Sequence, residues 1–448
     1  MSRKPKLSLF QIINMSVGFL GIQMGFALQN ANASRILSIF GADVHQLSWF
    51  WIVAPLTGMV VQPIIGYYSD RTWTRLGRRR PFFLVGALLA AVGLIMMPRA
   101  DFLVAFIPAI WVGAGFLMIM DASFNVAMEP FRALVADKLD SDQTTLGFSV
   151  QTILIGVGAV IGSWLPYALH NWFGVSNQSE NNAIPFHLIL SFSIGAAVLV
   201  FSILQTVLST KEYSDEEMLA FGETSPEANQ QDSIKSRFML TQLVQDFGKM
   251  PQTMKQLGLV QFFSWFALFG MWVFTTPAIA HHIYGLPIAD THSEAYKSAG
   301  DWVGIIFGVY NGVSAIYAFF LPWIAKKINR KRTHAFSLLV GGIGLISVYF
   351  APSPEWLIAS MVMVGIAWGS ILAMPYAILA GSIPPNKMGV YMGIFNFFIV
   401  FPQIINALIG GLLVKYAYAG NPIFALVTAG VFMILGAVSV LQVKDKMA

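Results

Sequence analysis

The feature that most constrains this chain is a series of apolar stretches, each long enough to cross a membrane. A helix needs about 20 consecutive apolar residues to span the hydrocarbon core of a bilayer. Of the 448 residues, 56% are apolar or aromatic and only 11% are charged, whereas a soluble protein carries roughly 25% charged residues. The sequence therefore predicts an all-α integral membrane protein. Twelve spans can be counted, at approximately 8–34, 47–69, 81–98, 102–136, 144–170, 186–208, 256–284, 301–325, 335–351, 355–380, 388–415 and 421–443.

An arginine-rich turn separates the second span from the third. Residues 62–81 read QPIIGYYSDRTWTRLGRRRP, which contains five arginines and one aspartate, Asp70. Short loops rich in lysine and arginine mark the cytoplasmic side of a membrane protein. Pro81 suits the first turn of the third helix, where its missing N–H group is not needed. The turn therefore predicts the orientation of the chain, with this loop in the cytoplasm.

The remaining basic residues agree with this orientation when both termini are placed in the cytoplasm. Of the 27 lysines and arginines, the ones on the outer side are Arg35, Arg99, Lys297 and Lys415. Cytoplasmic loops thus explain the net charge of +5 and the pI of 9.2, and we expect no nucleic-acid partner. The N-terminal apolar stretch is too long for a signal peptide and predicts an uncleaved first helix. We expect a plasma-membrane protein, specifically of a bacterial inner membrane.

A long polar segment divides the spans into two sets of six. We expect an N-terminal six-helix bundle at 1–208, a cytoplasmic linker at 209–255 and a C-terminal six-helix bundle at 256–448. The end of the linker, 238–254, has the pattern of an amphipathic helix on the membrane surface, although it can also be a simple connection. Basic turns recur after the second and eighth spans, and PFRALVAD at the end of the fourth span matches PYAILAGS at the end of the tenth. Such repeats predict two facing bundles with a substrate site between them.

Asp121 is the clearest candidate for chemistry inside a span. It lies near the middle of the fourth span, with Asn125 and Glu129 at i+4 and i+8 on the same helix face, so we expect Asn125 to hydrogen-bond the aspartate. A carboxylate in mid-membrane is costly unless it is paired or protonated, and such residues mark proton and ion pathways. We expect Asp121 to bind a proton outside and release it inside. The alternative is a structural carboxylate tied to another helix. Glu129 and Arg132, nearer the cytoplasmic end, indicate a gating or structural ion pair.

Uncharged amides occur along the spans of both halves, and as a set they suit a polyhydroxylated ligand better than an ion or a lipid. Such amides, of which Gln261 in the seventh span is one, can also simply join neighbouring helices. Aromatic residues at comparable depths (Trp265, Trp272, Trp368 and Tyr376) can stack on sugar rings or serve as packing. The predicted substrate-binding residues are Gln23, Asn30, Asp121, Asn125, Gln151, Trp272, Asn311, Tyr376, Asn396 and Gln403.

Several motifs resemble those of a known group of carriers. The spacing of Gly66, Asp70, Arg71 and Gly77 before three arginines resembles the loop between the second and third helices of the major facilitator superfamily. APLTGMVVQPIIGYYSDR, LGRRRPF, PFRALVAD and GVYMGIFNFFIVFPQI resemble stretches of the plant sucrose–proton symporters and their bacterial and animal relatives, within the glycoside–pentoside–hexuronide:cation symporters. The resemblance covers most spans of both halves. It implies the major facilitator fold and secondary active transport.

The resemblance also implies roles for individual residues. Asp121 corresponds to the proton-coupling aspartate of the sucrose symporters, and Asn396 and Gln403 fall in their eleventh-helix motif. The arginine turn resembles a latch that locks one conformation, although it can also serve only to set topology. We expect the latch to hold the outward-open state through salt bridges between cytoplasmic helix ends. The predicted latch residues are Asp70, Arg71, Arg78, Arg79, Glu129 and Arg132.

The predicted function is import of a disaccharide together with a proton by alternating access. The chain departs from the plant symporters at Gln143, where they carry an arginine, and at Phe274, where they carry acidic residues, so maltose or another α-glucoside fits as well as sucrose. The alternatives are Na⁺ coupling, an exporter, or a non-transporting sensor on the same fold. The chain has no cysteine and no catalytic or metal-ligand spacing, so we expect neither an enzyme nor a cofactor or metal. The expected partners are the sugar, the proton and the lipid bilayer, with the protein acting as a monomer.

Overall fold

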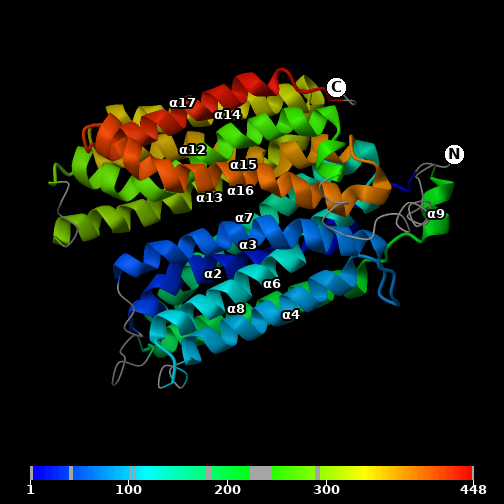
Figure 1. Ribbon diagram of the computed structural model, residues 1–448, viewed down its shortest axis with the longest axis horizontal. Coiled ribbons are helices and arrows are strands. Elements are labelled where there is room, and N and C mark those ends of the chain that lie inside the picture. Colours follow the sequence, from blue (N-terminus) through cyan, green and yellow to red (C-terminus); the bar gives the residue numbers. More distant parts are fainter. Residues whose placement is uncertain are drawn as a thin grey trace. The chain divides into compact units, whose positions relative to one another are not determined.

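The computed structural model is all-helical. It describes residues 4–39, 44–100, 103, 106–176, 184–221, 245–287 and 293–445, and these contain no β-strand. The chain divides into two compact units, and most of their helices are labelled in Figure 1. The first unit comprises Met1–Lys249 and Ile383–Asn396, and the second comprises Met250–Ser382 and Phe397–Ala448. The all-α fold expected from the apolar spans is confirmed.

The first unit holds the six predicted spans of the N-terminal half. Its helices are α1 (Leu9–Ser16), α2 (Gly18–Ile39), α3 (Val44–Arg71), α4 (Arg80–Met96), α6 (Ala109–Lys138), α7 (Thr144–Asn171), α8 (Phe186–Ser209) and the short α9 (Asp215–Ala220). The first expected span is built from two helices, α1 and α2, which meet at Val17. Gln143 ties the start of α7 to the chain before α1, because its side chain both accepts from the N–H of Leu7 (2.9 Å) and donates to its carbonyl (2.7 Å).

The second unit holds the spans of the C-terminal half. Its helices are α12 (Gln252–His282), α13 (Glu294–Ile328), α14 (Arg330–Ser347), α15 (Leu357–Ala380), α16 (Met388–Leu412) and α17 (Ile423–Val440). Helix α16 is shared, because its residues 388–396 belong to the first unit. The C-terminal segment is held within the second unit by the buried Arg330 at the start of α14, whose Nε and Nη2 contact the Asp445 carboxylate at 3.0 and 2.5 Å.

Four helix pairings recur in the two units. In the first unit α4 packs on α6 and α8, α2 packs on α8, and α3 packs on α6. In the second unit α14 packs on α15 and α17, α12 packs on α17, and α13 packs on α15. When the spans are counted in chain order within each half, these are the same pairs. The duplication predicted from the basic turns is therefore present in the packing of the helices.

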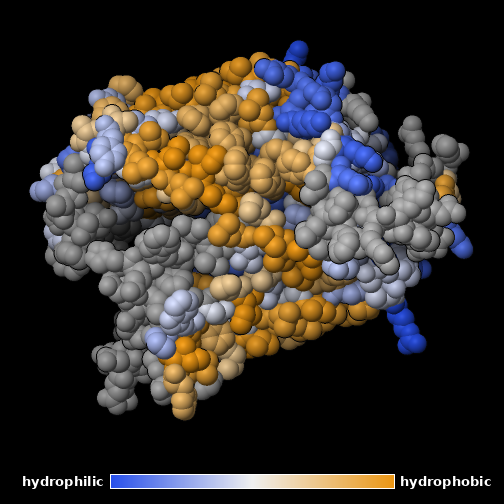
Figure 2. Space-filling view, viewed as in Figure 1, coloured by the Kyte–Doolittle hydropathy of each residue, from blue (hydrophilic) through white to orange (hydrophobic). Residues whose placement is uncertain are grey.

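The surface of these helices suits a lipid environment. Eleven helices among the described residues are long and apolar enough to cross a membrane. The remaining expected span, the second at 47–69, coincides with α3, a helix of 28 residues. Large apolar side chains are exposed along the helices, including Phe201 (72%) and Leu208 (82%) on α8 and Phe319 (70%) on α13. Figure 2 shows hydrophobic residues along the lengths of the helices and hydrophilic ones gathered at their ends. Exposed apolar area of this extent identifies an integral membrane protein.

The predicted linker is described only in part. Residues 222–244, which include much of the predicted amphipathic helix, lie outside the described residues. Before them α9 begins with a capping box formed by Ser214 and Glu217, and after them Asp246 lies in a single helical turn. Asp246 is buried, and its carboxylate binds Nζ of Lys387 at 2.6 Å. The division into a bundle at 1–208, a linker at 209–255 and a bundle at 256–448 stays a prediction.

Candidate functional site

The arginine turn is closed by its own backbone before α4 begins. Thr74 and Gly77 exchange backbone hydrogen bonds of 3.0 and 2.9 Å. Gly77 has a φ of 111°, a conformation that glycine adopts without steric cost. Helix α4 then starts at Arg80 with Pro81 in its first turn, as the sequence predicts. The residues before it, Arg78 and Arg79, present backbone N–H groups that have no partner inside the helix.

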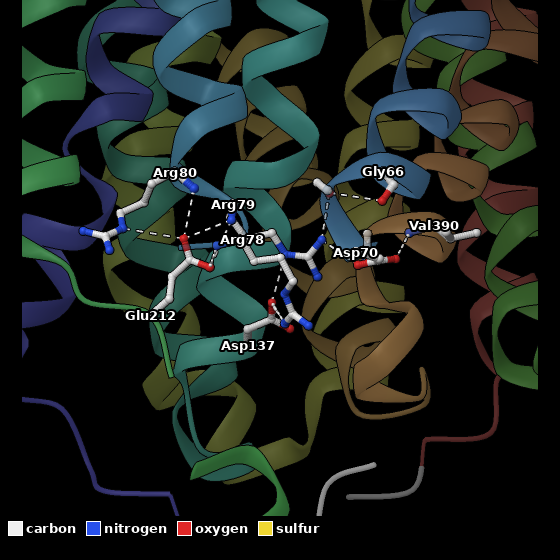
Figure 3. Close-up of polar contacts among 10 residues, drawn as sticks. Gly66, Asp70, Arg78, Arg79, Arg80, Asp137, Glu212 and Val390 are labelled. Atoms are coloured by element: carbon white, nitrogen blue, oxygen red, sulfur yellow. Dashed lines mark hydrogen bonds and ion pairs between the residues drawn. The ribbon is translucent and has the colours of Figure 1, made fainter. Parts of the chain in front are cut away.

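A carboxylate from the segment after α8 satisfies these groups. Glu212 accepts hydrogen bonds from the backbone N–H groups of Arg78, Arg79 and Arg80, each at 2.9 Å (Figure 3). A negative charge at this position also interacts favourably with the dipole of α4. Glu212 is itself buried, with 7% of its surface exposed. The start of α4 is therefore fixed by a residue that lies more than one hundred positions later in the chain.

The guanidinium of Arg79 is the centre of a buried ion-pair network. It is fully buried and contacts the carboxylates of Asp70 (2.5 Å) and Asp137 (3.0 Å) and the hydroxyl of Ser69 (2.8 Å). Arg78 also contacts Asp137, at 2.9 Å. Burial alone would lower the pKa of the Arg79 guanidinium, but Asp70 and Asp137 outweigh burial and raise that pKa above its ordinary value. We call Asp70, Arg78, Arg79, Asp137 and Glu212 the arginine-turn cluster.

Asp70 connects this cluster to the start of α16. Its two carboxylate oxygens accept hydrogen bonds from the backbone N–H groups of Gly389 (3.0 Å) and Val390 (2.8 Å) (Figure 3). The first turn of a helix is a favourable place for a negative charge. Gly66 makes the approach possible, because a Cβ atom at this position would collide with the carbonyl of Gly389. The G-x-x-x-D spacing therefore lets α3 lie against α16 and places the aspartate at its N-terminus.

Three of the predicted latch residues are assembled in this cluster and three lie elsewhere. Asp70, Arg78 and Arg79 form its ion pairs. Arg71 stacks on Tyr67 of its own helix, with the guanidinium carbon 3.7 Å from the ring centre, and donates to the Tyr67 carbonyl at 3.2 Å. Glu129 and Arg132 form a buried pair within α6, at 3.0 Å. The other two members, Asp137 and Glu212, were not predicted.

Asp121 lies in a group of buried polar side chains within the first unit. It is 3% exposed, and its Oδ1 accepts a hydrogen bond from Gln29 Nε2 at 2.7 Å. Asn125 donates to the backbone carbonyl of Asp121 at 2.7 Å and accepts from Gln62. The carboxylate is thus held by Gln29 of α2, whereas the sequence suggested Asn125 as its partner.

The remaining predicted amides of the first unit differ in their surroundings. On α2, Gln23 is half-buried and Asn30 is exposed. Gln151 is 1% exposed, and neither its amide nitrogen nor its oxygen has a hydrogen-bond partner among the described residues. Asn396 is 5% exposed, and its Nδ2 likewise has no partner within that part of the chain. Asn125 and Asn396 both approach Gly58, where an added Cβ would lie 3.3 and 3.4 Å from their side chains.

In the second unit, the structure brings together three of the four aromatic residues singled out in the sequence. The rings of Trp265, Trp272 and Trp368 lie 5.7–6.1 Å apart, and Trp272 Nε1 donates to the hydroxyl of Tyr310 at 3.1 Å. Tyr376 is buried, with 2% of its surface exposed. The other predicted contacts bond to their own helices: Asn311 to the carbonyl of Phe307 (3.0 Å) and Gln403 to that of Ile399 (3.1 Å).

Sequence reasoning missed several of the polar residues that the fold assembles. Gln29 of the first span is not among the predicted binding residues, and Gln62 lies at the start of the arginine-rich stretch 62–81. Asp137 ends the run PFRALVAD, and Glu212 follows an apolar helix in what the sequence suggests is a linker. The predicted topology could have indicated them, because Asp137 and Glu212 both lie at helix ends on the same predicted side of the membrane as the arginine turn.

Comparison with known proteins identifies the family. The model of the Major Facilitator Superfamily matches residues 15–300 and 286–446. The chain belongs to this superfamily. As a member of the Major Facilitator Superfamily it is an integral membrane carrier, not an enzyme. Among its relatives, Sucrose transport protein SUC4 of Arabidopsis thaliana is 24% identical over 98% of this chain and 91% of that protein. General alpha-glucoside permease of Schizosaccharomyces pombe is 28% identical, but the match covers 59% of this chain and only 47% of the permease.

Solved structures of the superfamily share the fold. A structure of the fucose:proton symporter FucP of E. coli aligns with a TM-score of 0.71 at 13% identity, over 98% of this chain and 99% of FucP. The proton:xylose symporter XylE, bound to 6-bromo-6-deoxy-D-glucose, aligns with a TM-score of 0.67 at 13% identity, over 96% of this chain and 94% of XylE. The major facilitator fold implied by the sequence motifs is therefore confirmed for this member of the superfamily.

Proposed function

We propose that this protein imports a disaccharide, either sucrose, maltose or a related α-glucoside, together with a proton by alternating access. The names of its relatives support a sugar substrate, since they include a sucrose transport protein and an alpha-glucoside permease. The single observation that carries proton coupling is the state of Asp121. It is a buried carboxyl in a membrane helix with no cation bound to it among the described residues.

The two oxygens of Asp121 suit a group that takes up and releases a proton. Oδ1 is held by Gln29 at 2.7 Å, whereas Oδ2 has no hydrogen-bond partner in the described ranges. As a carboxylate, Oδ2 accepts a proton or a hydroxyl hydrogen; once protonated, it donates a hydrogen bond. Coupling requires that protonation and sugar binding favour the same rearrangement, so that neither ligand alone resets the carrier. We propose that Asp121 meets this requirement because its carboxyl binds the proton and also contacts the sugar.

The sugar is proposed to bind the polar and aromatic side chains predicted from the sequence. Gln151 and Asn396 support this, because they carry buried amide atoms without a partner among the described residues. A buried unpaired polar group costs stability, and hydroxyl groups of a sugar would satisfy it. Asn125, already bonded to Gln62, would orient them. The rest of the proposed set is Gln23, Asn30, Asp121, Trp272, Asn311, Tyr376 and Gln403.

The arginine-turn cluster is proposed to act as the cytoplasmic latch. It joins α3, α4, the end of α6 and the first turn of α16 through buried charges, and these contacts would have to break for the carrier to change state. Because buried ion pairs are costly to separate, the latch would hold the outward-open state until ligands bind.

On this proposal both termini lie in the cytoplasm of a bacterial cell, and the protein acts as a monomer in the inner membrane.

Uptake of labelled sugars tests the proposed function. Cells that express the protein should accumulate at least one of radiolabelled sucrose, maltose, trehalose and melibiose above an empty-vector control. A protonophore should abolish the accumulation, and replacing Na⁺ by K⁺ at fixed pH should leave it unchanged. Uptake that persists with protonophore but requires Na⁺ would contradict proton coupling. Absence of uptake for all four sugars would contradict the disaccharide assignment.

A further inference from the structure

An aromatic cluster in the second unit is only partly covered by protein. Trp265 and Trp272 of α12 lie 6.1 Å apart, and Trp368 of α15 lies 5.7 and 5.9 Å from them, in edge-to-face arrangements. Tyr310 of α13 completes the cluster, 6.5 Å from Trp368. Tyr310 is buried, but each of the three tryptophans is only half-buried. The cluster therefore presents indole surface that other side chains of the unit do not cover.

Polar atoms at this cluster lack partners. Trp272 Nε1 donates to the hydroxyl of Tyr310, whereas the buried Nε1 of Trp265 has no hydrogen-bond partner among the described residues. Gln261 precedes Trp265 by four positions and so lies on the same face of α12. It is 0% exposed, and both its amide nitrogen and its amide oxygen also lack a partner in the described part of the chain. Three unpaired polar atoms thus accompany the uncovered aromatic surface.

We propose that Gln261 and the Trp265–Trp272–Trp368 cluster form a binding subsite for one pyranose ring of a glycoside. The apolar C–H face of the ring packs against indole, and its hydroxyls bond the Gln261 amide and Trp265 Nε1. Every side chain of the subsite is uncharged, which favours a neutral polyhydroxylated ring over an acid or an amine. The subsite rests on the proposed function and deepens it, because it adds Gln261, Trp265 and Trp368 to the residues that recognise sugar.

The unpaired amide gives the proposal a two-sided test. A buried amide without a partner destabilises the sugar-free protein, so Gln261→Leu, which removes it at similar volume, should keep or raise the sugar-free melting temperature. The same substitution removes a sugar contact, so the Kd for sugar should rise about tenfold, the equivalent of about 1.4 kcal/mol. The measurement uses the purified full-length protein in detergent, titrated with maltose and separately with sucrose. Sorbitol, which has hydroxyls but no ring, should not bind.

A second variant keeps the proposal testable if Gln261→Leu folds poorly. Trp265→Phe retains an aromatic ring but removes the unpaired Nε1–H, and it should weaken sugar binding several-fold with little change in the sugar-free melting temperature. Trp356→Phe is the matched control, because Trp356 is 63% exposed in the same unit, and it should bind sugar as the unmodified protein does.

The outcomes separate this proposal from the proposed function. If the unmodified protein binds sugar and both Gln261→Leu and Trp265→Phe bind it equally well, the subsite is wrong and disaccharide transport stands. A lower sugar-free melting temperature in Gln261→Leu with unchanged sugar affinity would assign the amide a structural role instead. If the unmodified protein binds neither maltose nor sucrose, trehalose and melibiose are titrated next, and failure to bind all four sugars contradicts the proposed function and the subsite together.

Discussion

Asp70 and Val390 are hydrogen-bonded at 2.8 Å although 320 positions separate them in the chain. The other oxygen of the same carboxylate accepts a hydrogen bond from the N–H of Gly389. Arg79, at the start of α4, contacts the same carboxylate. One aspartate thus links the ends of α3 and α4 to the first turn of α16. A carrier that changes conformation at this point has to break several interactions at once.

Removing the charge of Asp70 should destabilise the protein. Asp70→Asn leaves the buried guanidinium of Arg79 with one carboxylate fewer, and breaking a buried ion pair costs about 3–5 kcal/mol. We expect a clear fall in the melting temperature in detergent and a lower transport turnover. Arg71→Ala is the matched control, because the guanidinium of Arg71 bonds and stacks only on Tyr67 among the described residues, and we expect a loss of about 1 kcal/mol or less. Equal losses of stability in the two variants would contradict the assignment of the Asp70–Arg79 ion pair to the centre of the cluster.

Arg79→Lys should not be a conservative change. The guanidinium uses Nη1 for Asp70 and Ser69 and Nε for Asp137, whereas a lysine has a single nitrogen. We expect a loss of about 2–4 kcal/mol, as for other broken buried networks. The pKa of Arg79 is raised in the folded state, so the stability from this group is present below the unfolded pKa and is lost only as pH rises through the higher folded value. Melting temperatures between about pH 6 and 9 should therefore show no loss from Arg79 titration.

Glu212 should stabilise the start of α4. Glu212→Ala leaves three backbone N–H groups without their acceptor, and losing a helix cap costs about 0.5–2 kcal/mol. Glu212→Gln keeps one acceptor oxygen, so its melting temperature should fall between those of the alanine variant and the unmodified protein. Hydrogen exchange at 78–80 should speed up in the alanine variant. Unchanged exchange there would contradict the capping role.

Gly66 should tolerate no side chain. In Gly66→Ala the added Cβ would collide with the carbonyl of Gly389, so the start of α16 has to shift. We expect lower stability and slower transport, with a cost of about 1–3 kcal/mol, as for an overpacked core. Gly312→Ala on α13 is the control, since a Cβ there meets nothing within 4 Å. It should be neutral or stabilising by about 1 kcal/mol, because alanine favours helix over glycine.

The fold was predictable from the sequence because membrane helices are recognised by their composition. Twelve apolar spans, the turn before Pro81 and the duplicated basic turns all follow from residue type and spacing alone. The hydrogen-bond partners of individual side chains were harder to predict from the sequence, because they depend on the rotation of each helix about its axis. Asp121 was identified as a buried carboxyl, but its donor proved to be Gln29 instead of Asn125, which bonds the backbone of its own helix.

The side-chain contacts of the arginine turn were likewise only partly predictable from the sequence. Its aspartate and two of its arginines lie in one cluster, whereas Arg71 stacks on Tyr67 and Glu129 pairs within α6. Asp137 and Glu212 supply the other carboxylates that the arginines of the turn bind. Both come from segments distant in sequence, and helix-end contacts of this kind follow from how α4, α6 and α8 pack rather than from local spacing.

Transport by Asp121→Asn in proteoliposomes tests the central claim most directly. With an inward proton gradient, liposomes holding the unmodified protein should accumulate labelled disaccharide above the external concentration. The account predicts that Asp121→Asn abolishes this uphill accumulation while sugar counterflow exchange survives, because asparagine keeps hydrogen-bonding capacity but cannot carry a proton. Undiminished accumulation by the Asp121→Asn protein would contradict the proposal that this carboxyl couples the proton to the sugar.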